Sequence, residues 1–103
     1  MKLSVPTFVK VADLLHMRSG YNVKVNIIEA HERIIDTRRG DKMKIVNCVV
    51  GDETALVNAF FKGDNTTLIK EGNVIAIRNG VKRFFKRHIC LEIDLFGRVT
   101  EEK

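Results

Sequence analysis

Long apolar runs are absent from this sequence. No stretch approaches the roughly 18 consecutive apolar residues that a membrane-spanning helix needs, and Pro6 and Lys10 interrupt the first residues before a signal-type run develops. We therefore expect a soluble protein that is not secreted and has no membrane partner. The length of 103 residues predicts one domain, and the 45% of hydrophobic residues favours a folded chain over a disordered basic tail.

Cysteine is scarce. Cys48 and Cys90 are the two cysteines, and they lie far apart, each within an alternating apolar stretch where small buried side chains are expected. We interpret both as free core thiols, and the sequence leaves a disulfide between them open. This usage is typical of a reducing compartment, so we expect the protein in the cytosol or the nucleus.

Motifs for catalysis and metal binding are missing as well. The sequence has no Gly-rich phosphate loop, no HExxH and no CxxC, and its three histidines have no Cys or carboxylate neighbours at metal-ligand spacing. The adjacent acids Asp52 and Glu53 fit a hairpin turn better than a pair of catalytic carboxylates. We expect no enzyme activity, no metal, no cofactor and no small-molecule substrate.

Apolar alternation predicts five strands. The first, Tyr21–Ile35, carries Val23, Val25 and Ile27 on one face and is long enough to be strongly curved. A helical turn is expected before it at 11–15, and the later strands are expected at 43–50, 54–62, 73–78 and 89–93.

The predicted connections complete the pattern. A polar loop at 36–42 and a tight turn at 51–53 join the first three strands. A short helix is expected at 64–72, after capping residues and before Gly72, and a turn at Asn79–Gly80. Five strands with a short helix between the third and fourth form the all-β OB-fold, a small Greek-key barrel. An SH3-like barrel is the rival fold, and it usually lacks that helix.

Positive charge is concentrated in one segment. Four cations that account for four of the five net positive charges flank two aromatic rings: Lys82, Arg83, Phe84, Phe85, Lys86 and Arg87. Single-stranded nucleic acid needs both components, because cations follow the phosphates and rings stack on the bases. In the alternative interpretation, the cations are merely solvated and one of the two rings fills the end of the barrel, since neighbours in an extended segment point opposite ways.

A second basic cluster lies in and after the first loop, partly offset by Asp36 and Asp41: Arg38, Arg39, Lys42 and Lys44. In an OB-fold, the loop between strands one and two and the loop between strands four and five flank the same binding face. We therefore predict that the two clusters flank one groove.

The third predicted strand has two distinct faces. Val57, Ala59 and Phe61 are expected in the core, and the opposite face then carries Leu56, Asn58, Phe60 and Lys62. In this register, Phe60 is an exposed ring beside Lys62, suited to stacking. If the register is reversed, Phe61 takes that role.

Several motifs together resemble a known family. They are Thr7–Val11, Ser19–Val25, Val50–Thr54, Ile69–Gly72, Ile77–Lys86 and Asp94–Val99, which together span nearly the whole chain. In order and spacing they are similar to the archaeal single-OB-fold single-stranded DNA-binding proteins and to the small OB-fold component of the animal single-strand sensor. The resemblance to the related small plant OB-fold proteins is greater still.

The resemblance implies a binding site. Family members that bind DNA use aromatics at the end of strand three and on the hairpin between strands four and five, with basic residues nearby. Phe85 and Lys86 match this pattern, whereas the strand-three aromatic, usually Trp, falls at Lys62, and the first hairpin aromatic falls at Val81. The implied mode shifts toward phosphate contacts from Lys62, Lys82, Arg83, Lys86 and Arg87, with Phe60 and Phe84 as substitute rings.

Two functions remain from the sequence. The first is non-catalytic, largely sequence-independent binding of single-stranded nucleic acid, with DNA placed ahead of RNA. The second is an OB-fold interaction module whose partners are protein subunits of a larger nucleic-acid-associated complex. The lost aromatic positions favour the second, and the focused charge favours the first.

Overall fold

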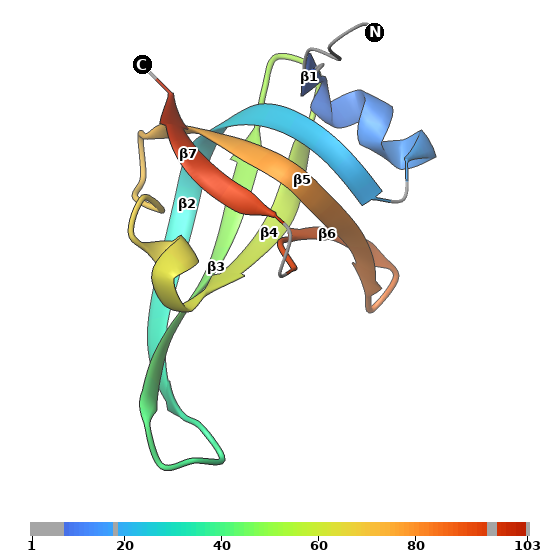
Figure 1. Ribbon diagram of the computed structural model, residues 1–103. Coiled ribbons are helices and arrows are strands. Elements are labelled where there is room, and N and C mark those ends of the chain that lie inside the picture. Colours follow the sequence, from blue (N-terminus) through green and yellow to red (C-terminus); the bar gives the residue numbers. More distant parts are fainter. Residues whose placement is uncertain (1–7, 18, 95–96, 103) are drawn as a thin grey trace, which may run out of the picture.

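Alternating apolar residues form strands along most of the chain. The computed structural model describes residues 8–17, 19–94 and 97–102, and the side chains of Leu15, Ser19 and Phe85 lie outside this description. Figure 1 shows the elements, in chain order: β1 (Phe8–Val9), η1 (Val11–His16), β2 (Ser19–Asp36), β3 (Lys42–Gly51), β4 (Leu56–Lys62), η2 (Gly63–Thr66), β5 (Val74–Phe85), β6 (His88–Glu92) and β7 (Arg98–Glu102).

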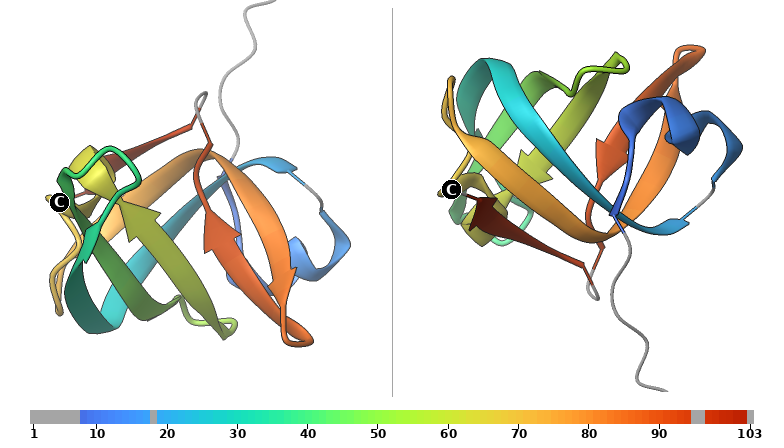
Figure 2. Two further views of the ribbon diagram at one scale, coloured as in Figure 1. Left: turned by 90° about the horizontal axis from the view of Figure 1, so that it is seen from below. Right: turned by 90° about the horizontal axis from the view of Figure 1, so that it is seen from above.

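Five of these strands close into a ring (Figures 1 and 2). β2 pairs antiparallel with β3 and with β5, β3 pairs with β4, and β5 pairs with β6. A short parallel contact, Asn58 with Cys90 and Ala59 with Leu91, joins β4 to β6 and completes the ring. The short helix η2 lies between the third and fourth ring strands, so the OB-fold predicted from the sequence is confirmed.

The core lies inside the ring. Val23, Val25 and Ile27 of β2 are at most 1% exposed, which confirms the face predicted from their alternation. η1 covers one end of the ring with Val11 and Leu14, both nearly fully buried. Each such side chain stabilises the fold by about 1.5–3 kcal/mol relative to an exposed one.

β2 is the longest strand and serves two neighbours. Its first half pairs with β5 and its second half with β3. A register shift between Ile27 and Glu29 marks a β-bulge, which bends the strand where it changes partner. The strongly curved first strand expected from the sequence is therefore confirmed.

The predicted turn at Asn79–Gly80 is wrong. β5 continues through both residues, and they form an irregularity in the β2–β5 pairing instead. Asn79 has a φ of 52°, and its backbone N–H donates to Asn22 Oδ1 at 3.0 Å. A Cβ at Gly80 would lie 2.5 Å from Tyr21 Cε1, so glycine lets the strand pass over the buried Tyr21 ring. The residue types that favour a turn here favour a bulge as well.

The predicted helix at 64–72 is shorter in the structure. η2 ends at Thr66, whose hydroxyl donates to Gly63 O at 2.7 Å, and irregular turns follow to Gly72. The hydroxyls of Thr66 and Thr67 donate to the carbonyls of Gly63 and Asp64, and such local bonds compete with a regular helix. The sequence pattern also did not predict β1 and β7, which pair along β2 and β5 respectively.

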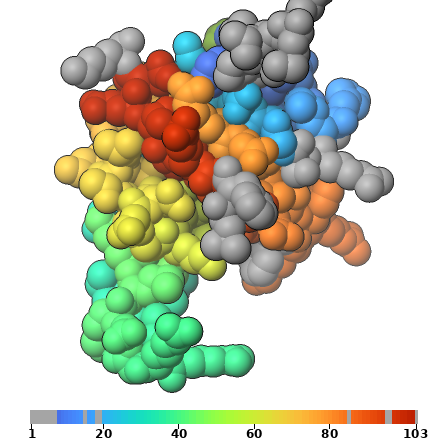
Figure 3. Space-filling model, viewed as in Figure 1, coloured from blue at the N-terminus to red at the C-terminus, as the bar shows by residue number. Residues whose placement is uncertain are grey.

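The β2–β3 hairpin extends beyond the ring. Residues 31–47, here called the arm, pair in register from His31 with Asn47 to Asp36 with Lys42. Figure 3 shows the arm projecting from the body of the molecule. The loop at its tip coincides with the polar loop predicted at 36–42.

Neither of the short helices in the described residues has the length or the hydrophobicity of a membrane span.

Candidate nucleic-acid interface

The outward side of β4 forms the centre of the candidate interface. Phe61 and Ala59 are 2% and 1% exposed and belong to the core, so the facing predicted for this strand is confirmed. Phe60 is half-buried on the opposite side, where Leu56 is 64% exposed. We call this side, together with the side chains that its neighbours place beside it, the β4 face. Its residues on β4 are Leu56, Asn58, Phe60 and Lys62.

Strand pairing brings further polar groups to the β4 face. Asn47 pairs with Phe60, and Ile45 pairs with both Lys62 and Arg33, so these side chains share one side of the sheet. A recess of about 480 Å³ opens there. Its walls are Arg33, Asn47, Phe60, Cys90 and Glu92.

A second recess continues the first toward the β5–β6 turn. It holds about 210 Å³ and shares Asn47 and Cys90 with the first recess. Its other end is formed by Lys86 from the turn and His88 from the start of β6, with Asn58 beside them. We call the two recesses together the furrow. Several residues of the furrow were not predicted as binding residues from the sequence: Arg33, Asn47, Asn58, His88, Cys90 and Glu92.

A polar signal for part of the furrow was present in the sequence. Asn47 and Asn58 are amides that interrupt otherwise apolar strands, and both are exposed on the β4 face. The contributions of Arg33 and Cys90 depend on strand register across the ring, which the local pattern does not contain.

The β5–β6 turn carries two of the predicted cations. Phe85 pairs with His88, which leaves Lys86 and Arg87 as a two-residue turn. Their φ values are 49° and 70°, as a type I′ turn requires, although such turns normally contain Asn and Gly. Both side chains are exposed, whereas the side chain of Phe85 lies outside the described residues.

The other predicted residues of β5 lie away from the furrow or are engaged. Lys82 Nζ donates to Leu14 O at 2.9 Å and lies 5.6 Å from the Phe84 ring centroid. The Phe84 side chain is 70% exposed, so it does not fill the end of the closed sheet, as the alternative interpretation of this segment allowed. Arg83 Nε lies 4.0 Å from Glu92 Oε2. Lys82 and Phe84 therefore belong to the side of the sheet that carries η1.

The arm cations gather elsewhere. A cleft of about 900 Å³ separates the tip of the arm from η2 and its following turn, and the four predicted cations line it: Arg38, Arg39, Lys42 and Lys44. Lys42 and Lys44 lie on the same side of β3 as the buried Val46, because they precede it by four and two residues. The two basic clusters therefore line different recesses. The arm cations lie in the cleft beside η2, and Lys86 lies at the furrow.

Carboxylates hold some cations and leave others available. Lys42 forms an ion pair with Asp36, and Lys44 Nζ lies 3.1 Å from Glu32 Oε1. Among the described residues, no carboxylate lies within ion-pair distance of the following cations: Arg33, Arg38, Arg39, Lys62 and Arg87. Three of these five, Arg33, Lys62 and Arg87, lie along or at the end of the β4 face.

The thiols at the furrow are poor nucleophiles. Both are free cysteines, as the sequence predicts, with Cys48 buried and Cys90 half-buried. Burial raises the pKa of Cys48 to about 12 and that of Cys90 to about 11. Because the thiolate is the reactive form, neither group supports covalent catalysis near neutral pH.

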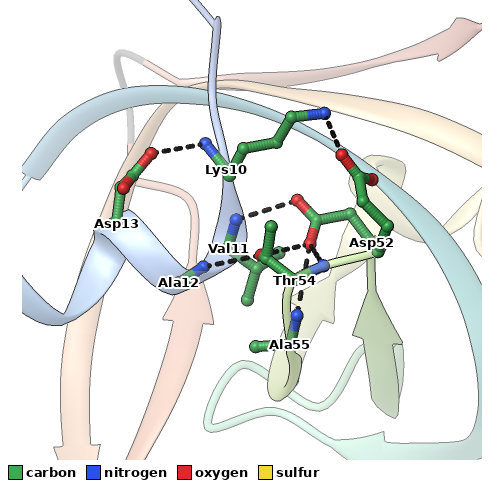
Figure 4. A network of polar contacts seen from close by, with 8 residues as sticks. Lys10, Val11, Ala12, Asp13, Asp52, Thr54 and Ala55 are labelled. Atoms are coloured by element: carbon green, nitrogen blue, oxygen red, sulfur yellow. Dashed lines mark hydrogen bonds and ion pairs between the residues drawn. The ribbon is translucent and has the colours of Figure 1, made fainter.

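Acidic side chains of the β3–β4 turn stabilise the turn and connect it to the start of η1 (Figure 4). Asp52 accepts hydrogen bonds from Val11 N at 2.9 Å, from Thr54 N at 2.8 Å and from Ala55 N at 3.3 Å. Partial burial opposes its ionisation, but these bonds and one from the Thr54 hydroxyl outweigh burial and hold the pKa of Asp52 below its usual value. In the described part of the chain, no group of three or more His, Cys, Asp or Glu side chains could hold a metal ion.

Comparison with known proteins identifies the family of this chain. The family model for single-stranded DNA-binding protein Ssb-like OB folds matches residues 14–101. The Ssb protein of Saccharolobus solfataricus is 34% identical over 93 residues, and an uncharacterized protein of Arabidopsis thaliana is 31% identical over 104. The matches cover 89% and 91% of this chain, which spans 62% and 68% of those relatives.

A solved structure agrees with the sequence matches. The solution structure of a hypothetical protein from Arabidopsis thaliana superposes with a TM-score of 0.79 at 28% identity, over 99% of this chain and 77% of that one. The family match and the relatives together show that this chain belongs to the Ssb-like family of OB-fold single-stranded DNA-binding proteins.

Proposed function

We propose that the protein is a non-catalytic, largely sequence-independent binder of single-stranded nucleic acid, which it holds across the β4 face. One observation carries this proposal. The half-buried Phe60 ring lines a recess whose surroundings include Arg33 and Lys62, two cations without a carboxylate partner among the described residues. Such a site has two components: an aromatic ring that can stack on a base, and cations that can reach the phosphates of the strand.

Electrostatic contacts supply much of the affinity. Lys62 occupies the position where the family usually has Trp, so Phe60, two residues earlier on the same side of β4, is the available stacking ring. Lys86 and Arg87 extend the positive charge at one end of the furrow, with Arg83 beside Glu92 in support. Arg38 and Arg39 extend it along the arm. Lys42 and Lys44, held by acids, chiefly shape the arm.

DNA is the preferred strand in this proposal. The matched family model and the Saccharolobus solfataricus relative both carry single-stranded DNA binding in their names. Comparison of thymidine and uridine oligonucleotides of equal length tests the preference directly, because a protein distinguishes the two backbones through the ribose hydroxyl.

The test of the proposed function is a fluorescence anisotropy titration with a labelled thymidine oligonucleotide at two salt concentrations. Affinity should fall steeply as salt rises, because several phosphate contacts release counterions. Lys86→Glu with Arg87→Glu should weaken binding to every sequence. Absence of binding at low salt would sink the proposal, and co-purification of a defined protein partner in that case would favour the interaction module.

A further inference from the structure

A third recess lies beyond the end of the furrow. It holds about 520 Å³ between η1, the β3–β4 turn and the start of β6. Seven of its eleven lining residues are apolar: Val11, Ala12, Leu14, Ala55, Leu56, Val57 and Ile89. The rest are Thr54, Asn58, Arg87 and His88. This recess lies outside the furrow on which the proposed function rests.

The wall of the recess is fixed by hydrogen bonds between η1 and the β3–β4 turn (Figure 4). Val11 N donates to Asp52 Oδ2 at 2.9 Å, and Ala12 N donates to Thr54 Oγ1 at 3.0 Å. Lys10 Nζ also lies 2.5 Å from Glu53 Oε1. These contacts tie two segments more than 40 residues apart in the chain, so the recess is a preformed part of the fold.

The recess is continuous with the furrow. Both include Asn58, His88 and Ile89. Leu56 lies on the same side of β4 as Asn58 and Phe60, because these residues alternate with the buried Ala59 and Phe61. The three recesses therefore follow one another along the β4 face, from Arg33 at one end to Leu56 at the other.

The chemistry at the Leu56 end suits a base and its phosphate. Leu56 is 64% exposed, which leaves a large apolar surface in water at the mouth of the recess. Arg87 lines the same recess and has no carboxylate partner among the described residues. An apolar wall removes the face of an unstacked base from water, and a cation beside it can contact the adjoining phosphate.

We propose that this recess, the Leu56 recess, is an end subsite that takes one unstacked base of the bound strand while Arg87 contacts the adjoining phosphate. The inference rests on the proposed function, because the strand reaches the recess only by way of the furrow. The subsite extends the binding path to a part of the surface where aliphatic side chains, and not an aromatic ring, contact the base. An apolar segment of a protein partner is the competing occupant.

A double-mutant cycle between protein and oligonucleotide tests the subsite. The protein variant is Leu56→Ser, and its matched control is Ile34→Ser, since Ile34 is 63% exposed on the arm. The oligonucleotides carry a terminal base or an abasic site at the 5′ or the 3′ end. At one of the two ends, loss of the base should weaken binding to the unsubstituted protein by about fivefold or more, because the apolar contacts of that base are lost.

The expected cycle is non-additive. With the complete strand, Leu56→Ser should bind more weakly than the unsubstituted protein, by about the same factor as removal of the terminal base weakens binding to the unsubstituted protein. When Leu56→Ser is combined with the abasic strand, affinity should fall little further. Ile34→Ser should respond like the unsubstituted protein. Equal affinity for complete and abasic strands, or additive losses, would overturn the subsite. Failure of the unsubstituted protein to bind any strand would refute the proposed function instead.

Crosslinking tests the subsite without a substitution. A 4-thiothymidine placed at the end identified by the abasic strands should crosslink to residues 54–58 or 87–89. Crosslinks confined to the arm would overturn the proposal. If Leu56→Ser weakens binding of a labelled apolar peptide but not of the strand, the recess binds a protein partner and the proposal is wrong.

Discussion

At the scale of single residues, the turn between β5 and β6 trades stability for charge. Lys86 and Arg87 both adopt left-handed backbone conformations. For residues other than Gly, this conformation costs roughly 1–2 kcal/mol each, and Asn or Asp tolerates it better. The proposed binding role of the two charges accounts for the presence of these costlier residues in the turn.

The substitution Lys86→Asn combined with Arg87→Gly tests this trade. The variant should raise the free energy of unfolding by about 1–2 kcal/mol, because Asn-Gly suits a type I′ turn. It should also bind single-stranded oligonucleotides more weakly, because two phosphate contacts are lost. Urea unfolding and anisotropy measure the two effects. A variant that is no more stable, or that binds as tightly as the original chain, would refute the trade.

Asp52 links stability to pH. Its folded-state pKa is lower than the unfolded value of about 3.9. The stabilisation is therefore fully present above about pH 4 and is lost as the pH falls through the folded-state pKa. Asp52→Asn should destabilise the fold near neutral pH by about 1–2 kcal/mol, since hydrogen bonds to a charged acceptor are lost.

Thermal unfolding at neutral and acidic pH measures the contribution of Asp52. The difference in melting temperature between the two proteins should shrink as the pH falls below about 4. Glu53→Gln is the matched control, because the Lys10–Glu53 ion pair is exposed and contributes little. A constant difference at every pH would contradict the role assigned to the Asp52 carboxylate.

At the scale of elements, two adjacent residues of β4 have different roles, one in the core and one on the proposed binding face. Phe61 is 2% exposed in the core, and Phe60 lines the furrow on the opposite side. The same truncation at the two positions should therefore have opposite consequences.

Phe61→Ala should cost about 3–5 kcal/mol of unfolding free energy. Phe60→Ala should cost much less stability but weaken binding by about 1–3 kcal/mol, the contribution of one stacked base. Denaturant unfolding and anisotropy on both variants provide the comparison. If Phe60→Ala binds the strand as well as the original protein does, the ring is not a stacking platform.

The element scale also shows what local sequence determines. Alternation predicted the core face of β2 and β4, because the side-chain period of a strand is a local property. The same local signal at Asn79–Gly80 misled, since a bulge and a turn favour the same residues. η2 is shorter than the predicted helix because the hydroxyls at and just after its end bond to nearby carbonyls.

The partners of each strand are a non-local property. Arg33 and Cys90 reach the β4 face only through the β2–β3 and β4–β6 pairings, and neither shows a local signal for binding. The arm cluster illustrates the converse. Its cations were recognisable in the sequence, yet their location beside η2 depends on which side of β3 each side chain occupies.

At the scale of the whole molecule, closure of the ring brings together the strands that form the proposed binding face. β4 and β6 meet through only two residue pairs, and the furrow lies over this junction. The arm and the β5–β6 turn lie toward opposite ends of that face, as Figure 2 shows. A strand that crosses the face meets Arg33 and Lys62 on the way, whereas Lys42 and Lys44 face the cleft beside η2.

The most direct test of this account compares the salt dependence of binding in two charge-matched variants. One is Arg33→Gln with Lys62→Gln on the β4 face, and the other, the arm variant, is Lys42→Gln with Lys44→Gln on the opposite side of the arm, in the cleft beside η2. Each phosphate contact to single-stranded nucleic acid contributes about 0.7 to the slope of log affinity against log salt. The β4-face variant should reduce the magnitude of the slope by about 1.4, twice that contribution, and the arm variant should leave it nearly unchanged. Equal reductions, or a larger one for the arm, would contradict the placement of the strand on the β4 face.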